Sequence, residues 1–450
     1  MIFVLLVMLI IILFISYKIF CKDIMQPAII MNIMYIISVG CACVNVNKWN
    51  ISLNIVTFFI ILLGTIEFII INYLFYKKIQ KNNYKESSKK NTQIKFNIKK
   101  WKVTFICIFN IITILCFIYY VVSIAKHYGN FDSFSQALSI FKEHTSYNND
   151  VSLPKYVNWL QKFTYPFAYI MLFYYLKDIV NSNKNEKVKK AISNIYYLIS
   201  PICFIIQEFI TSNRLSILSL LLGVIVMLAI IYYEKYNWNK LLPFKSIFII
   251  CVFGVLFVVG FYYSATLVGR KNSKKMIDYI TLYAGGSIEC LNLYIKEPPK
   301  NENYIVGQES FYYLIKNLND YKLIHVNSFP TIHLEFRHNN DEMIGNVYTA
   351  YRRWINDFGY FGAFVLNGIM AAFYGLFYNI LKKISNIKLK DFFVILYAYM
   401  AYPVFLHCID GYFYLLTVRI AFFTTLAIFA TVYLFVNDFS LKTLKKGILK

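Results

Sequence analysis

Long apolar runs separated by short polar segments dominate the chain. A helix needs about 20 apolar residues to cross the hydrocarbon core of a bilayer, where its own hydrogen bonds satisfy the backbone. The pattern therefore predicts an all-α, polytopic integral membrane protein with about eleven transmembrane helices. We place them at residues 2–20, 27–46, 53–76, 103–125, 163–180, 191–210, 214–233, 244–267, 358–381, 391–408 and 413–436.

Composition favours one membrane domain. The chain has 450 residues, 58% of them hydrophobic, and a mean hydropathy of +0.52. Removal of the predicted spans leaves no soluble domain of ordinary size, so we treat residues 1–450 as a single membrane domain. The first apolar run has no preceding charge, and Lys18 and Lys22 follow it. A signal peptide has the opposite arrangement, so we expect a retained span.

The distribution of lysines sets the predicted orientation. The segment 77–102 holds ten lysines and one acidic residue, Glu86, as the positive-inside rule expects of a cytoplasmic loop. With this loop inside, the lysine-rich segments 181–190, 234–243 and 382–390 and the C-terminal tail also fall inside. The prediction is a multi-pass protein whose N-terminus lies outside and whose C-terminus is cytoplasmic.

The net charge of +23 does not indicate nucleic acid, because the lysines cluster beside apolar spans, where anionic headgroups attract them. We therefore expect the lipid bilayer, and no nucleic acid, as a partner. The nine cysteines lie mostly inside apolar runs and form no C-x-x-C pair. They are expected to be small buried hydrophobic residues.

The predicted outer side includes one large extracytoplasmic loop, residues 269–357. It carries eleven basic and ten acidic residues and many tyrosines, and mixed charge of this kind is typical of a folded, hydrogen-bonded segment. Within the loop, residues 277–295 are apolar and contain Gly285 and Gly286. We expect an interfacial or re-entrant helix there, because a twelfth span would reverse the orientation downstream.

All six arginines and all six histidines fall in stretches that the predicted topology puts on the outer face. Arginine binds phosphate through a planar fork, whereas lysine acts as a point charge. We therefore expect an anionic group to be held on that face. The alternative is that these residues only line polar loops. The arginines are Arg214, Arg270, Arg337, Arg352, Arg353 and Arg419.

A polar turn joins the span that ends near Glu208 to the span that begins at Arg214. A cation at a helix N-terminus opposes the helix dipole, so Arg214 needs a compensating anion. The alternatives are an ion pair with Glu208 or contact with lipid headgroups. Arg270 directly follows the next predicted span, where an interfacial anchor is an equally consistent interpretation.

The stretch 333–338 combines two histidines, His333 and His338, with Glu335 and Arg337. Its spacing does not match the zinc-protease order H-E-x-x-H, so metal binding is not favoured. We expect a polar patch in which one histidine acts as a base.

The most specific stretch of the chain runs from Gly345 to Gly362 and leads from the loop into the ninth predicted span. Asp357 stands at the expected helix entry, and a carboxylate there caps free N–H groups, which is its structural alternative. Headgroup contact is the alternative for the two adjacent arginines. The candidate substrate-binding side chains of this stretch are Asn346, Tyr348, Arg352, Arg353 and Trp354.

Three polar residues, His407, Asp410 and Arg419, surround the last two predicted spans. Counted from the start of the last span, Arg419 lies roughly 9 Å inside the helix at ~1.5 Å per residue. An arginine within the membrane is costly and marks a candidate site, and Asp410 is its expected partner. The sequence contains no nucleotide-binding or serine-hydrolase motif, so nucleotide chemistry is not expected.

Taken together, these features resemble the oligosaccharide repeat-unit polymerases, the Wzy type that builds O-antigens and capsules in bacteria. The similarity covers the topology of the whole chain. It is sharpest at Asn346-Val347-Tyr348-Thr349, at Asp357-Phe358-Gly359-x-x-Gly362, and in the small polar turn Ser212-Asn213-Arg214-Leu215-Ser216.

The resemblance implies a membrane glycosyltransferase of the bacterial inner (plasma) membrane. Its donor would be an oligosaccharide on polyprenyl pyrophosphate, its acceptor a second lipid-linked repeat unit, and a chain-length regulator protein would be a further partner. Arginines would stabilise the departing diphosphate, chiefly Arg214 and Arg270. Because arginine would take the role of a divalent ion, we expect no metal and no cofactor.

The remaining roles follow from the same resemblance. The candidate bases that would activate the acceptor hydroxyl are His333, His338, Asp357 and Glu208. The tyrosines and Trp354 would stack on sugar rings. The side chains expected to assist in substrate binding are Glu208, Arg337, Asn346, Tyr348, Arg352, Arg353, Trp354, Asp410 and Arg419.

Two other functions stay open. A flippase for lipid-linked oligosaccharides is a transporter, and such proteins are expected to show two repeated halves, which this sequence lacks. An O-antigen ligase would perform the same chemistry on a different acceptor.

Overall fold

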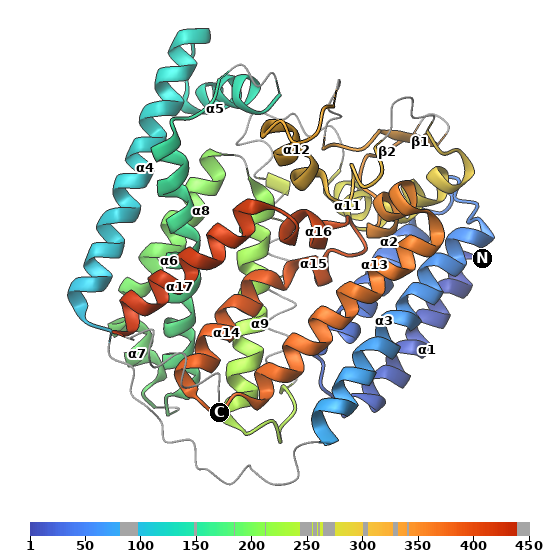
Figure 1. The fold of residues 1–450 in the computed structure, drawn as a ribbon, viewed down its shortest axis with the longest axis horizontal. Helices are drawn as coiled ribbons and strands as arrows, with labels where there is room; N and C mark the ends of the chain where they lie inside the picture. The colour runs from blue at the N-terminus through green and yellow to red at the C-terminus, as the bar shows by residue number, and fades with distance from the viewer. Residues whose placement is uncertain are drawn as a thin grey trace. The chain divides into compact units, whose positions relative to one another are not determined.

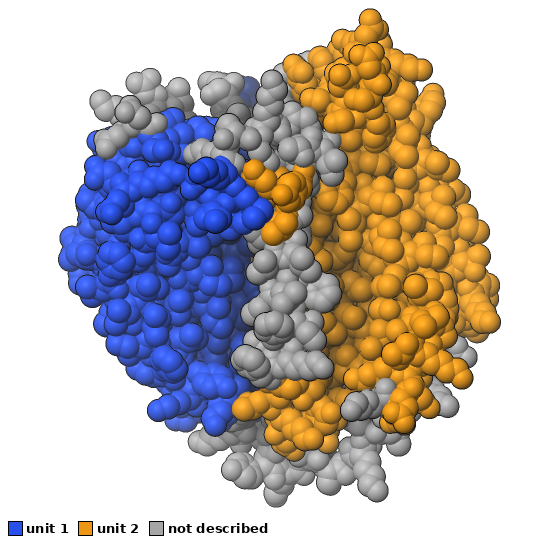
Figure 2. Space-filling view, turned by 180° about the vertical axis from the view of Figure 1, so that it is seen from behind, with its two compact units in different colours: residues 1–89, 274–383, 403–424 blue, residues 90–273, 384–402, 425–450 orange. Residues whose placement is uncertain are grey.

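The computed structural model describes residues 1–81, 98–147, 151–183, 185–211, 213–243, 254, 259, 262–263, 275–299, 305–326, 332–339 and 342–438. Within them the chain is mostly helical, as the apolar pattern predicts (Figure 1). The chain divides into two compact units, which Figure 2 shows in different colours. Unit 1 comprises Met1–Lys89, Lys274–Lys383 and Pro403–Thr424, and unit 2 comprises Lys90–Ser273, Ile384–Tyr402 and Thr425–Lys450. The single membrane domain stays a prediction.

Unit 1 is a helical bundle that carries a short hairpin. Its elements are α1 (Ile2–Ile19), α2 (Pro27–Val44), α3 (Ile55–Lys81), α11 (Met276–Lys296), α12 (Tyr312–Asp320), β1 (Arg337–Asn339), β2 (Glu342–Gly345), α13 (Ala350–Lys383) and α16 (Tyr412–Thr417). Helix α13 packs along α3, and α2 packs against α1 and α11 (Figure 1). The strands pair antiparallel, with His338 opposite Met343, and they rest on α11.

Helix α11 corresponds to the segment expected to be interfacial or re-entrant. It is one continuous helix that does not break at Gly285 or Gly286. A Cβ at Gly285 would lie 2.6 Å from the backbone nitrogen of Ala42. Glycine is therefore needed here so that α11 can approach the backbone of α2 closely, rather than to interrupt the helix.

Unit 2 is also helical. Its elements are α4 (Lys100–Tyr128), α5 (Phe134–Lys142), the π-helix Glu143–Tyr147, α6 (Lys155–Asn181), α7 (Lys187–Ser193), the 3-10 helix Ile195–Leu198, α8 (Ile199–Ile210), α9 (Arg214–Lys235) and α14 (Ile387–Met400). One apolar core joins α4, α5 and the start of α6 through Phe117, Phe141 and Val157. Helices α15 (Tyr402–Phe405) and α17 (Ile420–Asn437) contain residues of both units.

Seven helices within the described residues are long and apolar enough to cross a membrane: α1, α2, α3, α4, α9, α13 and α17. The number becomes eight if the bent pair Lys187–Ser193 and Ile195–Ile210 is one span. The multi-pass membrane character predicted from the sequence therefore has structural support. The predicted count of about eleven spans and the direction of the termini stay predictions.

Several predicted spans differ in detail from the structure. The pair that replaces span 191–210 is bent by 58°. Span 391–408 is interrupted, because α14 ends at Met400 and α15 is a separate short helix. Span 413–436 is divided into α16 and α17, and Arg419 lies in the break. Span 244–267 lies almost entirely outside the described residues.

The ninth predicted span is preceded by a helical segment that the sequence does not predict. Residue 358 is the expected start, and a kink at Gly359 divides α13 there into a first segment that begins at Ala350 and the longer apolar helix that follows. The additional first turns are polar in sequence but buried in the structure, since Arg352, Arg353 and Asp357 are each no more than 6% exposed. Tertiary contacts therefore extend the helix, and these contacts form the candidate site.

Candidate functional site at the start of α13

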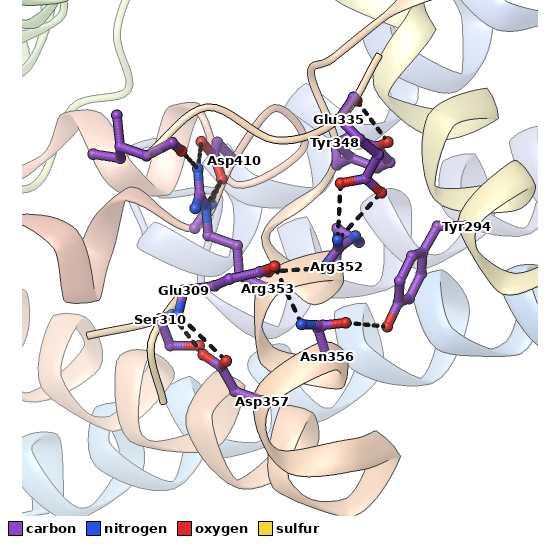
Figure 3. A network of polar contacts seen from close by, with 12 residues as sticks. Tyr294, Glu309, Ser310, Glu335, Tyr348, Arg352, Arg353, Asn356, Asp357 and Asp410 are labelled. Atoms are coloured by element: carbon purple, nitrogen blue, oxygen red, sulfur yellow. Dashed lines mark hydrogen bonds and ion pairs between the residues drawn. The ribbon is translucent and has the colours of Figure 1, made fainter. Parts of the chain in front are cut away.

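The first turns of α13 carry four polar residues that face neighbouring loop segments of unit 1 (Figure 3). Arg352 and Asn356 are one helical turn apart, as are Arg353 and Asp357, so each pair forms one column of side chains on the helix surface. Their partners lie at residues 309–310, 332–335 and 410, far away along the chain.

Arg352 binds two carboxylates. Its Nη1 donates to Glu309 Oε2 over 2.7 Å, and its Nη2 donates to both carboxylate oxygens of Glu335 over 3.2 and 3.0 Å. The guanidinium carbon lies 4.1 Å from the ring centroid of Tyr294 and 5.5 Å from that of Tyr348. Two acids and two aromatic faces thus balance a charge that is 1% exposed, which would otherwise be too costly to bury.

Arg353 binds a single carboxylate through a complete fork. Its Nε and Nη2 donate to the two oxygens of Asp410 over 2.6 and 3.0 Å. Nη2 also donates to the backbone oxygen of Ile332 over 3.1 Å. The sequence predicts Asp410 as the partner of Arg419, and this prediction is wrong, because Asp410 is held by Arg353.

Asp357 accepts hydrogen bonds from the loop rather than capping a helix that it begins. The backbone nitrogens of Glu309 and Ser310 donate to its two oxygens over 3.3 and 2.6 Å. The adjacent Asn356 accepts from the hydroxyl of Tyr294 and donates to the carboxylate of Glu309. Residues 309 and 310 are therefore fastened to α13 through both backbone and side chain.

Two positions of the Asp357–Gly362 motif require glycine, each for a different physical reason. Gly359 has φ 67° and ψ −175°, which breaks the helical geometry inside α13 and is a conformation open in practice only to glycine. A Cβ at Gly362 would lie 2.2 Å from the Cβ of Phe358. The motif thus encodes a kink, and the kink separates the polar first turns of α13 from its apolar remainder.

Arg337 completes the cluster from the side of the hairpin. Its Nη2 donates to Glu335 Oε1 over 3.0 Å, and its Nε donates to the hydroxyl of Tyr348 over 3.1 Å. That hydroxyl donates in turn to the backbone oxygen of Glu335 over 3.0 Å. Glu335 therefore bridges two arginines.

The two glutamates of the cluster have opposite pKa shifts. Burial raises the pKa of Glu309 above the usual value for glutamate, although Arg352 opposes the shift. Burial also acts to raise the pKa of Glu335, but the charge of Arg352 and hydrogen bonds from the arginines outweigh it, so this pKa is lowered. Both carboxylates are compensated by the same cation, and Glu335 is the more strongly ionised.

Trp354 and Tyr348 are predicted to bind substrate, and both are fully buried, at 0% exposure. Trp354 packs against His407 and Tyr414, with ring centroids 5.3 and 5.7 Å away. Neither ring has a free face for a sugar in this structure. Their visible role is to support the arginines and the helix.

The predicted base candidates of the loop lie at the surface. His333 and His338 are both exposed, and they flank Glu335 and Arg337 in sequence. Asn346 directly follows β2 and is half-buried. The structure thus brings the arginines and acids together, while the histidines remain at the outer edge of the same segment.

Arg419 is not inside a helix. Helix α16 ends at Thr417 and α17 begins at Ile420, so the predicted depth of roughly 9 Å within a span is wrong. The guanidinium carbon lies 5.3 Å from the ring centroid of Tyr313, on α12. Arg419 therefore lies in the non-helical break between α16 and α17.

A polar chain inside unit 1 involves His407. Its Nδ1 lies 2.9 Å from the hydroxyl of Tyr35, and its Nε2 lies 3.2 Å from the side-chain oxygen of Asn367. Asn367 donates to Glu67 over 2.8 Å. Glu67 is an acid within a long apolar run, which is a sequence signal for a polar partner inside the bundle.

Glu208 and Arg214 belong to unit 2. Glu208 is fully buried, and Gln161 and Tyr165 donate to its carboxylate over 3.2 and 3.3 Å. Arg214 is the first residue of α9, where the sequence predicts it. Arg270 lies outside the described residues, so the proposed pairing of Arg214 with Arg270 stays a prediction.

Sequence reasoning does not select four members of the cluster as site residues: Tyr294, Glu309, Glu335 and Asn356. Glu335 is visible in sequence only as a member of the polar stretch 333–338, and the signal for Glu309 is the near balance of acidic and basic residues in the segment 269–357. Which acid meets which arginine depends on contacts between residues far apart in sequence.

In the parts of the chain that the structure describes, no group of three or more His, Cys, Asp or Glu side chains is arranged to hold a metal ion. The expected independence of metals and cofactors stays a prediction. Comparison of the chain with protein-family models, curated proteins and solved structures found no significant match.

Proposed function

We propose that the chain is a membrane glycosyltransferase that polymerises lipid-linked oligosaccharide repeat units. In this proposal it lies in the bacterial inner membrane with about eleven spans, the N-terminus outside, the C-terminus cytoplasmic and the site on the outer face. The donor is a glycan on polyprenyl pyrophosphate, and the acceptor is a second lipid-linked unit. A chain-length regulator protein is a proposed partner.

The observation that carries the proposal is the gathering of Arg337, Arg352 and Arg353 at the start of an apolar helix. Burial of an unpaired charge of this kind costs roughly several kcal/mol per ion. Guanidinium groups held in place by their neighbours can stabilise an anion that develops beside them once a carboxylate partner gives way. Transfer from a diphosphate lipid needs that kind of environment.

The chemistry follows from this arrangement. The acceptor hydroxyl attacks the anomeric carbon of the donor glycan, and its proton passes to a base. The bond between the anomeric carbon and the diphosphate oxygen breaks, so the diphosphate leaves on its lipid with its negative charge. Arginines stabilise that charge. Arg214 and Arg270 are proposed as the main pair, and the proposed assistants are Arg337, Arg352, Arg353 or Arg419.

The proposed base is one of four side chains, two histidines and two acids. His333 and His338 are the accessible candidates. Asp357 already accepts two backbone hydrogen bonds, and Glu208 is buried among neutral donors. The exposed histidines therefore fit the role of proton acceptor better, since a base must reach the substrate hydroxyl.

Deletion of the gene in its host, followed by complementation, tests the proposal. Without the protein, surface glycan should be limited to single capped repeat units, and the wild-type gene should restore a ladder of polymers. Arg214→Lys and Arg270→Lys should each leave expression intact and abolish the ladder, because lysine lacks the bidentate fork. Full-length polymer from both variants would refute the arginine clamp, and loss of all surface glycan on deletion would favour a flippase.

A further inference from the structure

The guanidinium groups of Arg352 and Arg353 differ in how completely their donors are used. On Arg353, Nε and Nη2 each reach a different oxygen of Asp410, which is the complete bidentate arrangement. On Arg352, Nη2 alone is shared between both oxygens of Glu335. The Nε of Arg352 is buried and has no hydrogen-bond partner in the structure as described.

This donor deficit is informative because the side chain is 1% exposed. A buried N–H without a partner destabilises the folded state, because its lost contact with water is not offset by a hydrogen bond. Arg352 Nη2 and Arg337 Nη2 both donate to the Glu335 carboxylate, and Arg352 Nε remains as a further donor without a partner. A carboxylate offers two oxygens, whereas the terminal group of a phosphate or diphosphate offers three and more negative charge.

The two carboxylates on Arg352 are not equally removable. Glu309 is 15% exposed, and α13 holds it through Asn356 and through the backbone contact to Asp357. The side chain of Glu335 is 32% exposed. Its backbone oxygen is fixed by Tyr348, so the carboxylate can swing towards solvent while the chain stays in place.

From these contacts we infer that Glu335 is an exchangeable occupant of an oxyanion site formed by Arg337 and Arg352. A phosphate-type oxyanion displaces the Glu335 carboxylate and binds both arginines, and the Tyr294 and Tyr348 rings keep the Arg352 fork in position. Departure of Glu335 leaves two arginines and one glutamate, so the site gains one unit of positive charge when it opens. The terminal phosphate of the lipid diphosphate gains its third unsubstituted oxygen when the bond to the glycan breaks. Identification of the oxyanion with this departing diphosphate rests on the proposed function, whereas the exchange itself does not.

Direct binding of inorganic pyrophosphate to the purified full-length protein tests the inference. Calorimetry in detergent should show Glu335→Gln binding about tenfold more tightly than wild type, because an internal competitor is removed. Glu297→Gln is the matched control, since it removes the same charge from an exposed residue of the same segment. Arg337→Gln, added to Glu335→Gln, should reverse the gain.

The inference is overturned if Glu335→Gln binds pyrophosphate no more tightly than Glu297→Gln does. Should Glu335→Gln not fold, Glu335→Asp takes its place: the shorter side chain reaches the arginines less well, and unchanged binding would equally overturn the inference. Repetition in nanodiscs of phosphatidylglycerol and of phosphatidylcholine identifies the source of the oxyanion. Weaker pyrophosphate binding in the anionic discs indicates that headgroups compete for the same site, and equal binding indicates a soluble or substrate phosphate. If Glu335→Gln binds pyrophosphate more tightly but the wild-type protein makes no polymer, the exchange at Glu335 is supported and the proposed polymerase activity is refuted.

Discussion

Arg352 and Arg353 are neighbours in sequence and equally buried, yet they serve two different kinds of contact. Arg353 and Asp410 form a closed pair in which both fork donors have an oxygen each. Arg352 meets Glu335 through one nitrogen, and its Nε is left without a partner among the described residues. The closed pair is suited to holding the loop at residue 410 on α13, and the open one is suited to exchange.

The comparison shows why a buried arginine is not by itself a substrate ligand. Arg353 is predicted from sequence to bind substrate, but an anion would have to break a bidentate pair that is 4% and 16% exposed. At Arg352 an anion has to move only the more exposed Glu335. Both residues are arginines. The one whose fork donors all have acceptors has a structural role, and the one with a donor left over is suited to bind an anion.

The largest effect is expected at the closed pair. Arg353→Met should destabilise the protein by about 3–5 kcal/mol, because the Asp410 carboxylate would remain buried without its cation. Thermal unfolding of the detergent-solubilised protein measures the loss. Arg353→Met combined with Asp410→Leu should recover part of it, and a single variant as stable as wild type would show that the pair is not a fastener.

The second largest effect is expected at Gly359, the kink that follows the helical turns carrying both arginines. Gly359→Ala should cost about 1–3 kcal/mol, since a Cβ strains the φ and ψ found there. Gly40→Ala is the matched control in α2, where an added Cβ meets nothing within 4 Å and should be neutral or slightly stabilising. Equal unfolding temperatures of the two variants would contradict the assigned backbone strain.

Arg352→Lys should have a smaller effect than Arg353→Met, about 1–2 kcal/mol. Lysine keeps the charge but loses the fork and the stacking on Tyr294. The free energy of pyrophosphate binding should weaken by more than the free energy of unfolding does. This difference is expected only if Arg352 binds an exchangeable anion. A variant that loses stability while binding pyrophosphate normally would remove Arg352 from the site.

The smallest effect concerns pH. The lowered pKa of Glu335 means that its contribution to stability is present above the unfolded-state pKa and is lost as pH falls through the folded-state pKa. Because Glu335 is about one-third exposed, the contribution should be below about 1 kcal/mol. Unfolding midpoints measured from pH 7 to pH 3 should fall less steeply in Glu335→Gln than in wild type. Identical profiles would show that this carboxylate is not paired.

The sequence predicts the helical membrane class well, because apolar length is a local property. Helices α1, α2, α3, α4 and α9 follow the predicted runs closely. The helical segment of α13 before the kink at Gly359 is not readable, since residues 350–357 are polar and become helical through contacts with distant loops. The break at residue 401 does have a local signal, because Pro403 has no N–H for the helical hydrogen bond to residue 399. The break at residues 418–419 falls at the charged Arg419.

For the site, the sequence selects most of the basic residues but not which acid pairs with which arginine. Arg337, Arg352, Arg353, Asp357 and Asp410 are all candidates from the sequence and lie in one polar network, but the sequence assigns Asp410 to Arg419 and the structure pairs it with Arg353. Glu309 and Glu335 are only two of the ten acids in the segment 269–357. Their pairing depends on the path of the loop, and no local spacing encodes that path.

The most direct test of the proposed activity is an assay with purified protein and one lipid-linked repeat unit as the only substrate. The account predicts a ladder of products that stay attached to polyprenyl pyrophosphate, with one free polyprenyl pyrophosphate released for each bond formed. Addition of a chelator should leave the ladder unchanged. Absence of any product longer than the starting unit, or activity that requires added magnesium, would contradict the account.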